Sequence, residues 1–255
     1  MNDTRVAHLV SVSVATMALA TMVGCAAQRS TSRCADPAAL VPAYVSPAEL
    51  SRIADQIDPS SLLVINPHNG SGAAKDPAFA EAIDRLRSAG IPMLGYVATD
   101  YGTRDPRVVV QDAARYARWY GIDGIFLDEV TTAEAALPRY TRLVSQLRAR
   151  DVRPIALNPG HTPAPGYFAL ADIIVTFEGT YADYRNLTTP APSPSAGVMR
   201  ARTAHLIFDA TPAQAEQVRH TSRADYVYAT PGTMPNPWQV ASPTLTARPT
   251  GQPPC

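Results

Sequence analysis

Carboxylates end two apolar segments of the chain, in positions where they could act on a sugar. "GIFLDE" (124–129) finishes on Asp128 and Glu129, and "DIIVTFE" (172–178) finishes on Glu178. Hydrolysis of a glycosidic bond uses one protonated carboxyl, which donates to the leaving oxygen, and one ionised carboxylate at the anomeric carbon. We therefore expect Asp128, Glu129 and Glu178 to be catalytic. The alternative for each acid is a loop cap or a salt-bridge partner.

The spacing of these acids sets their expected geometry. Neighbouring residues on a strand point to opposite faces, so Asp128 and Glu129 should not both face one site. One of them should act from the lip of the loop, with Glu178 as the partner across it. Burial beside Phe177 would raise a carboxyl pKa, as an acid catalyst requires. Asp209 also ends an apolar run, but it heads "DATP" and is expected to cap the next helix.

Most other segment ends carry hydroxyl or amide side chains, and few carry a positive charge. Such a lining suits a neutral polyol, whereas a phosphate would require Arg, Lys or bare backbone N–H groups. We expect a sugar subsite lined by Tyr44, Asn66, Tyr96, Asn158 and Tyr181. Asn158 in "LNPG" could instead only shape a turn, and the tyrosines could be packing residues. Trp238, in "MPNPW", either stacks on a sugar or pins the C-terminal tail.

Eight short apolar runs rich in Val, Ile and aromatic residues are typical of strands buried on both faces. They are 43–45, 62–66, 93–98, 124–128, 154–158, 172–178, 205–209 and 225–229. Helical segments alternate with them. The pattern predicts an α/β protein with a (β/α)8 TIM-like barrel, whose chemistry lies at the C-terminal strand ends. A doubly wound sheet is the alternative, but nothing resembles its Gly-rich phosphate turn.

The helix starts are marked by a capping residue followed by Pro. Glu49 and Gln214 stand three residues after their caps and predict capping boxes. Gly90 and Gly121 are expected to close two helices. The four cap and Pro pairs are Ser46-Pro47, Asp76-Pro77, Asp105-Pro106 and Thr211-Pro212.

The N-terminus predicts an export signal. Residues 1–24 combine a short segment containing Arg5 with an apolar stretch, and "MVGC" (22–25) resembles a lipoprotein signal in which Cys25 is lipidated. Ordinary signal cleavage or an uncleaved anchor are the alternatives. We expect a tether at 25–40 and one domain at 41–255. The protein is then exported, as a cell-envelope lipoprotein or a secreted form, and touches the membrane only through its lipid.

Composition excludes several other classes. Lys plus Arg and Asp plus Glu are both 22, so no net charge attracts nucleic acid. Cys34 and Cys255 could form a disulfide joining the chain ends after export, or remain free thiols. The five His have no metal-ligand spacing, and we expect neither a metal nor another cofactor. A monomer is expected.

Several long strings resemble the spherulin-4-like family (spherulation-specific family 4). They run in order from about Tyr44 to Trp238 and include "LLVINPHNGSGAAKDPAF", "RYARWYGIDGIFLDEV" and "LNPGHTPAPGYFALADIIVTFEGTYADY". The resemblance implies a (β/α)8 glycoside hydrolase of the fungal type that cuts α-1,4-linked N-acetylgalactosamine in galactosaminogalactan, a biofilm polysaccharide. It also implies an active site built from the Asp-Glu pair and the Glu after the sixth strand, which are Asp128, Glu129 and Glu178 here.

The expected function is therefore that of an exported endo-acting glycoside hydrolase on an amino-sugar polysaccharide. A non-catalytic carbohydrate-binding lipoprotein on the same barrel is the first alternative. It has no need for three carboxylates around a neutral ligand. A structural envelope protein is the second.

Overall fold

Eight parallel strands form the centre of the structure, a computed structural model that describes residues 37–187, 201–242 and 245. Each strand pairs with the next along the chain, as in a TIM-like barrel, so the predicted (β/α)8 fold is confirmed. The strands are β1 (Leu40–Ala43), β2 (Leu62–Ile65), β3 (Met93–Ala98), β4 (Gly124–Asp128), β5 (Ile155–Leu157), β6 (Ile173–Thr180), β7 (Arg202–Phe208) and β8 (Tyr226–Ala229). The predicted signal peptide, Cys25, Cys34 and Cys255 lie outside the described residues.

The barrel closes between β8 and the residues just before β1. Ala38 forms a parallel bridge with Tyr226, and the Val227 N–H donates to the Ala38 carbonyl at 2.9 Å. The first strand, Leu40–Ala43, lies earlier than the predicted 43–45. Residue 41, the predicted start of the domain, is already part of this strand. Proline has no N–H for the ladder and is uncommon inside a strand. In the structure Pro42 lies within β1 and is buried.

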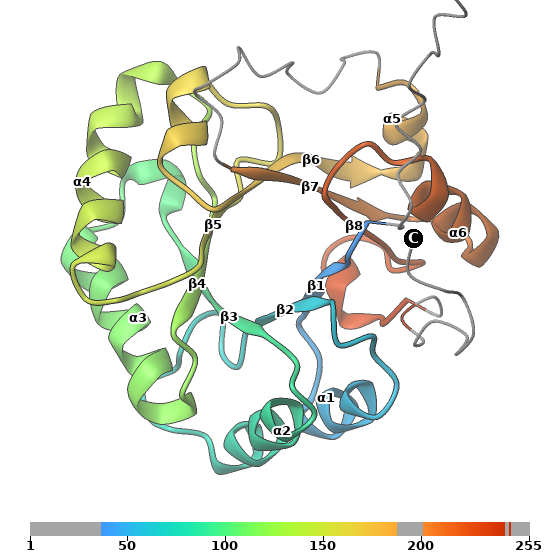
Figure 1. Cartoon of the computed structure of the whole chain (residues 1–255), viewed down its shortest axis with the longest axis horizontal. Coiled ribbons are helices and arrows are strands. Elements are labelled where there is room, and N and C mark those ends of the chain that lie inside the picture. The colour runs from blue at the N-terminus through green and yellow to red at the C-terminus, as the bar shows by residue number, and fades with distance from the viewer. Residues whose placement is uncertain (1–36, 188–200, 243–244, 246–255) are drawn as a thin grey trace, which may run out of the picture. The chain divides into compact units, whose positions relative to one another are not determined.

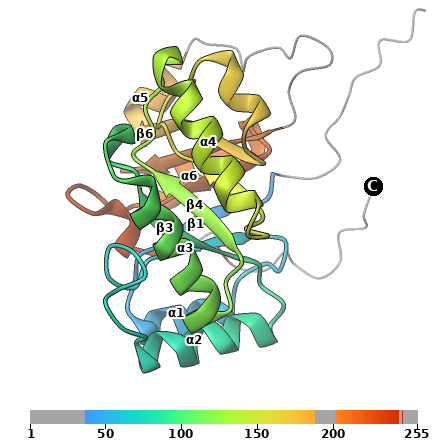
Figure 2. The same ribbon diagram turned by 90° about the vertical axis from the view of Figure 1, so that its left-hand side faces the viewer.

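In the part of the chain that the structure describes, six α-helices are present. They lie outside the strands (Figures 1 and 2). The four helices that connect β1 to β5 are regular. In contrast, β5 and β6 are joined by a short 3-10 segment at Pro165–Ala169, and the helix after β6 is short. Among the described residues, no helix is long and apolar enough to span a bilayer. The helices are α1 (Pro47–Ala54), α2 (Pro77–Ser88), α3 (Pro106–Tyr120), α4 (Leu137–Arg148), α5 (Tyr181–Arg185) and α6 (Pro212–Thr221).

The predicted caps begin four of these helices. The side chains of the caps accept backbone N–H groups of the first turn, which have no partner within the helix. At α6 the capping box of Thr211 and Gln214 is complete. At α1 the second capping box is wrong, because only the first half forms and the Glu49 carboxylate pairs with Arg52. The four caps are Ser46, Asp76, Asp105 and Thr211.

Candidate active site

A cavity of about 270 Å³ opens at the C-terminal ends of the strands. Five of the predicted site residues lie in its wall, which is where a barrel of this type carries its chemistry. These five are Tyr44, Asn66, Tyr96, Asp128 and Glu178. The rest of the wall comprises Asn69, Phe208, Met234, Pro235, Asn236, Pro237 and Trp238.

Asn158 joins the two acids of this cavity. Its side-chain nitrogen donates to Asp128 Oδ1 at 2.7 Å and to Glu178 Oε2 at 2.6 Å. The two carboxylate oxygens therefore lie at most about 5.3 Å apart, the sum of the two bond lengths, so the two acids are close neighbours. Asn158 Oδ1 also accepts the Gly160 N–H at 2.9 Å. Asn158 thus makes the turn and also reaches the acids, although it is not one of the residues that form the cavity wall, and its contact with a sugar stays a prediction.

The two acids do not hold protons equally well. Burial raises the pKa of Glu178 to about 7, the charge of Asp128 adds to the rise, and hydrogen bonds from Asn158 and Trp238 oppose it. Burial also raises the pKa of Asp128, but three hydrogen bonds stabilise its ionised form, from the Glu129 backbone, Tyr96 and Asn158. Glu178 is therefore the group that keeps a proton near neutral pH.

A bulge in β6 lies just before Glu178. β6 and β7 pair in register up to Val175, and the register then shifts by a bulge before Phe177. Bulges are frequent beside active sites because they redirect side chains. Phe177 packs in an apolar cluster with Tyr181 and Ile207, while Glu178 lines the cavity.

Two tyrosines form the wall on the β1 and β3 side. The rings of Tyr44 and Tyr96 meet edge to face, with centroids 5.4 Å apart. Burial raises the pKa of both hydroxyls, and Asp128 raises them further. Tyr96 therefore stays protonated and donates its hydrogen bond to Asp128.

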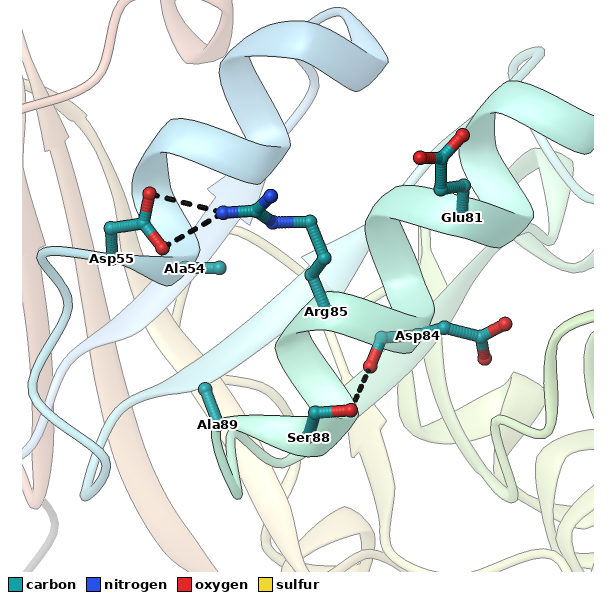
Figure 3. A pocket seen from close by; sticks show the side chains of 7 residues that line it. All are labelled: Ala54, Asp55, Glu81, Asp84, Arg85, Ser88 and Ala89. Carbon is teal, nitrogen blue, oxygen red and sulfur yellow. Dashed lines mark hydrogen bonds and ion pairs between the residues drawn. The ribbon is translucent and has the colours of Figure 1, made fainter.

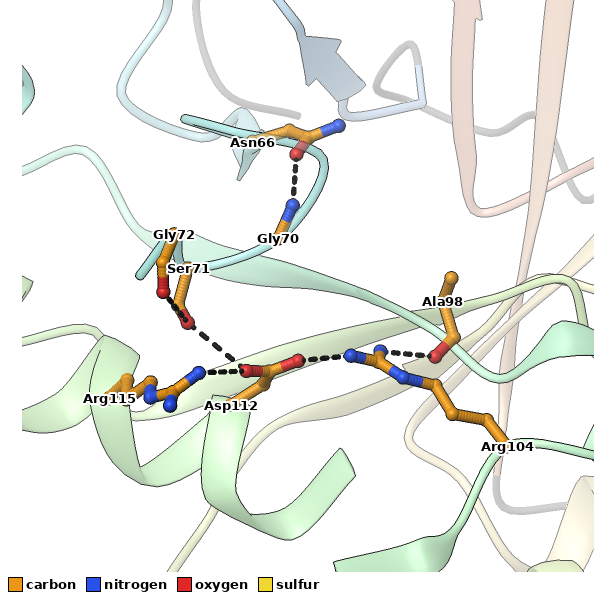
Figure 4. Close-up of polar contacts among 8 residues, drawn as sticks. All are labelled: Asn66, Gly70, Ser71, Gly72, Ala98, Arg104, Asp112 and Arg115. Atoms are coloured by element: carbon orange, nitrogen blue, oxygen red, sulfur yellow. Dashed lines mark hydrogen bonds and ion pairs between the residues drawn. The ribbon is translucent and has the colours of Figure 1, made fainter. Parts of the chain in front are cut away.

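Asn66 lies in a loop that is anchored from behind (Figure 4). Its Oδ1 accepts the Gly70 N–H at 2.7 Å, and the Ser71 hydroxyl donates to buried Asp112 at 3.2 Å. Arg104 and Arg115 bind the same carboxylate at 2.6 and 3.0 Å. Arg104 also donates to the Ala98 carbonyl at the end of β3. One buried acid thus joins the loop after β2 to the loop after β3.

Glu129 lies at the rim and outside the cavity wall. Its φ of 52° turns the chain directly after Asp128, the last residue of β4. Burial raises its pKa, and the carboxylates of Asp128 and Asp100 add to the rise.

Two sequence-based assignments are corrected. Tyr181 is not brought to the cavity: it is buried under α6, where its hydroxyl donates to Gln217 at 3.1 Å. It begins α5, and nothing in a single sequence shows which way the first residue of a short helix points. Asp209 does not cap α6, because Thr211 occupies that position.

Sequence reasoning underestimated the segment after β8. Trp238 is buried against Phe208 and Tyr228, with ring centroids 6.0 and 6.2 Å away, and it also hydrogen-bonds Glu178. It therefore pins the segment and reaches the site at once. Gly232 lets this segment fold back, because a Cβ there would collide with the Pro237 carbonyl. The signal was the Pro-rich "MPNPW" itself, whose path over the barrel mouth cannot be read from residue types.

The charges of the cavity limit its ligands. None of the twelve wall residues is Lys or Arg, so an anionic phosphate would meet two carboxylates and no cation. In the described part of the chain, no cluster of His, Cys, Asp and Glu is arranged to hold a metal ion. A neutral or amine-bearing polyol suits this wall.

A second hollow lies on the helical wall between α1 and α2 (Figure 3). Arg85 pairs with Asp55 across it at 3.1 Å, and both side chains are more than half exposed. The hollow has no buried carboxyl group paired with a hydrogen-bond donor, and we assign it no chemistry. Its lining is Ala54, Asp55, Glu81, Asp84, Arg85, Ser88 and Ala89.

Comparisons with known proteins agree with this architecture. A sequence model of spherulation-specific family 4 matches residues 38–247. Spherulin-4 of Physarum polycephalum is 34% identical over 154 residues, 58% of this chain and 46% of that protein, so the match spans about half of the relative's length.

Two solved structures are similar in fold. Aspergillus clavatus Sph3 in complex with GalNAc has a TM-score of 0.66 at 24% identity, over 81% of this chain and 93% of that one. A GH18 chitinase from Pseudoalteromonas aurantia has a TM-score of 0.46 at 13% identity, over 75% of this chain and 93% of that one. The first likeness shows a shared barrel.

Proposed function

The chain belongs to spherulation-specific family 4, and we propose that it is a glycoside hydrolase that cuts within an amino-sugar polysaccharide. One observation carries the proposal: a single amide, that of Asn158, donates to Asp128 and to Glu178, whose pKa burial raises to about 7. A paired acid and carboxylate in a wall of tyrosine and amide side chains is the equipment of glycoside hydrolysis.

Each acid has a distinct role in this proposal. Glu178 donates its proton to the glycosidic oxygen as the bond to the anomeric carbon breaks. Asp128, held ionised by Tyr96 and Asn158, stabilises the positive charge that develops at that carbon. The close spacing of the two acids supports retention of the anomeric configuration. Asp128 then bonds to the anomeric carbon as the sugar leaving group departs with the Glu178 proton. Water next displaces Asp128 from that carbon while Glu178 takes the proton of the water. Glu129, whose charge raises the pKa of Tyr96, is the third acid of the proposed site and positions the attacking water or tunes the pKa of its neighbours.

N-acetylgalactosamine is the first sugar to test. The structure of Sph3, which shares this barrel, was solved with GalNAc. The cavity is near the lower end of the ~300–1,000 Å³ range of ligand pockets, so it suits one sugar residue, with the neighbouring residues of a polymer lying along the rim. Tyr44, Asn66 and Tyr96 supply hydroxyl and amide groups for the hydroxyls of this sugar.

The test is product analysis on an N-acetylgalactosamine-rich polysaccharide. We expect the exported domain (26–255) to release reducing ends and oligosaccharides of many lengths from the first minutes, the pattern of internal cutting. The double variant Asp128→Asn/Glu178→Gln should bind the polymer and release nothing. If the wild type binds without release, the non-catalytic carbohydrate-binding alternative holds. If it neither binds nor cuts, the sugar is a different one or the protein is structural.

We also propose that the protein acts outside the cell, anchored by a lipid on Cys25. The support is the sequence of residues 1–25 alone. Metabolic labelling with a fatty acid should mark the wild type and not Cys25→Ser. An unlabelled but secreted wild type would show ordinary signal cleavage instead.

A further inference from the structure

The corner where β3 and β4 leave the barrel is built from unusual backbone. Asp100, Tyr101 and Glu129 have φ values of 48°, 53° and 52°. This left-handed region is unfavourable for residues with a Cβ, and such residues persist only where their surroundings hold them. The pairing of Ala98 with Asp128 in the sheet brings the two loops together.

Thr99 is the side chain that holds this corner. It is 2% exposed, and its Oγ1 lies 3.0 Å from the Asp128 carbonyl and 2.8 Å from the Glu129 carbonyl. The same oxygen lies 3.0 Å from the Tyr140 hydroxyl. Backbone bonds add to the contact, from Thr99 N–H to the Asp128 carbonyl and from Tyr101 N–H to the Glu129 carbonyl, at 2.9 and 2.7 Å.

Donor counting fixes the direction of these bonds. A carbonyl oxygen only accepts, and a threonine hydroxyl has one proton. The Thr99 proton is therefore shared by the two carbonyls, and Tyr140 must donate to Thr99. The Tyr140 oxygen in turn accepts the Thr131 N–H at 3.4 Å. The result is a directed chain from Thr131 through Tyr140 and Thr99 to the peptide groups of the two acids.

The carbonyls in question belong to the residues on which the proposed chemistry depends. We propose that Thr99, oriented by Tyr140, is a positioning residue that fixes the peptide groups of Asp128 and Glu129, so that the Asp128 carboxylate reaches Asn158. The inference rests on the proposed function for its kinetic consequence. Its structural consequence is independent of function. Small displacements of a catalytic group lower rates strongly, so a loose corner lowers kcat more than substrate affinity.

Three variants separate the hydroxyl from the shape of the side chain. Thr99→Val keeps the shape and removes the hydroxyl, Thr99→Ser keeps the hydroxyl, and Tyr140→Phe removes only the donor to Thr99. We expect Thr99→Val to lower kcat about tenfold or more, with KM within about threefold of wild type. Thr99→Ser should remain within about threefold in both constants, and Tyr140→Phe should fall between the two.

Amide hydrogen exchange supplies a readout that needs no activity. The Tyr101 and Thr99 N–H groups, which are bonded to the two carbonyls, should exchange faster in Thr99→Val and at the wild-type rate in Thr99→Ser. Should folding of Thr99→Val fail, Tyr140→Phe carries the same comparison. Unchanged exchange and unchanged kcat in Thr99→Val would overturn the positioning role. A wild type that cuts no glycan would overturn the proposed function and leave the exchange result to decide on Thr99.

Discussion

At the scale of single residues, the site depends on an unequal distribution of donors. Tyr96, Asn158 and a backbone N–H reach Asp128, whereas Glu178 receives two bonds and faces the charge of Asp128. In the proposed mechanism, this inequality makes Glu178 the proton donor and leaves Asp128 as the charge-stabilising carboxylate. It has consequences for pH dependence and for stability.

Activity should fall on the alkaline side of the pH profile because Glu178 loses its proton there. Because the donor must be protonated, kcat/KM should fall as the pH rises through about 7, the pKa to which burial raises this carboxyl. The Trp238 hydrogen bond favours the ionised form, so Trp238→Phe should move the limb to higher pH. Rates from pH 5 to 9 test both points. Undiminished activity at pH 9, or a limb that stays in place in Trp238→Phe, would contradict the assignment.

The free energy of unfolding should also depend on the ionisation of Glu178. The pKa of Glu178 is higher in the folded protein than its ordinary value of 4.5. Its contribution to folding is therefore complete below pH 4.5 and is lost as the pH rises through about 7. Glu178→Gln cannot ionise, so relative to wild type it should gain up to about 3 kcal/mol of unfolding free energy between pH 5 and pH 8. Urea unfolding at the two pH values measures this. If wild type and Glu178→Gln differed in unfolding free energy by the same amount at pH 5 and at pH 8, the pKa of Glu178 would not be raised by folding.

Residue types could predict the acids but not every side chain around them. Asp128 ends β4, Asn158 directly follows β5 and Glu178 lies two residues before the end of β6. In a barrel these C-terminal strand ends share one face. Tyr181 does not line the cavity because it begins α5 and packs in an apolar cluster with Phe177 and Ile207. Trp238 depends on a turn after β8 that only the packing of Gly232 against Pro237 explains. Catalytic roles for Asp128, Glu129 and Glu178 stay predictions.

At the scale of elements, loops are tied to helices by buried charge. Asp112, on α3, is 5% exposed and binds Arg104, Arg115 and Ser71. Helix starts were readable because capping is local chemistry, whereas this network joins residues 41 positions apart in sequence. Nothing in the spacing of Ser71 and Asp112 announces the contact.

Removal of the Asp112 charge should destabilise the protein. Loss of one partner from a fully buried ion pair costs ~3–5 kcal/mol, and the partly exposed arginines here reduce that to about 2 kcal/mol for Asp112→Asn. Asp55→Asn is the matched control, because its pair with Arg85 is exposed and should be nearly neutral. Denaturant unfolding compares the two. Equal effects would mean that the Asp112 network does not anchor the loops.

At the scale of the whole molecule, the fold class follows from the alternation of apolar runs and capped helices, and eight strands in sequential order confirm it. The domain start was harder to place. Ala38 and Leu40 already take part in the barrel, and the proline in β1 conceals the strand. The connection between β5 and β6 contains a 3-10 segment at Pro165–Ala169 instead of an α-helix. The sequence did not predict this segment, because a 3-10 turn leaves no periodic apolar pattern.

Truncation tests the closure of the barrel. A chain that starts at residue 37 keeps the Ala38 bridge and Leu40, which is fully buried. A chain that starts at residue 41 lacks both, and loss of a buried leucine side chain alone costs ~2–5 kcal/mol. We expect the shorter chain to unfold at clearly lower denaturant concentration. Identical midpoints would show that β1 does not need these residues to close the barrel.

The most direct test of the account is the rate at which Glu178→Gln releases reducing ends from an N-acetylgalactosamine-rich polysaccharide. Glu134→Gln, at an exposed acid, is the control. Loss of general acid catalysis should lower the rate about 10²–10⁴-fold, with polymer binding retained and the control at the wild-type rate. A Glu178→Gln variant that cuts within a few-fold of wild type would contradict the assignment of Glu178 as the acid.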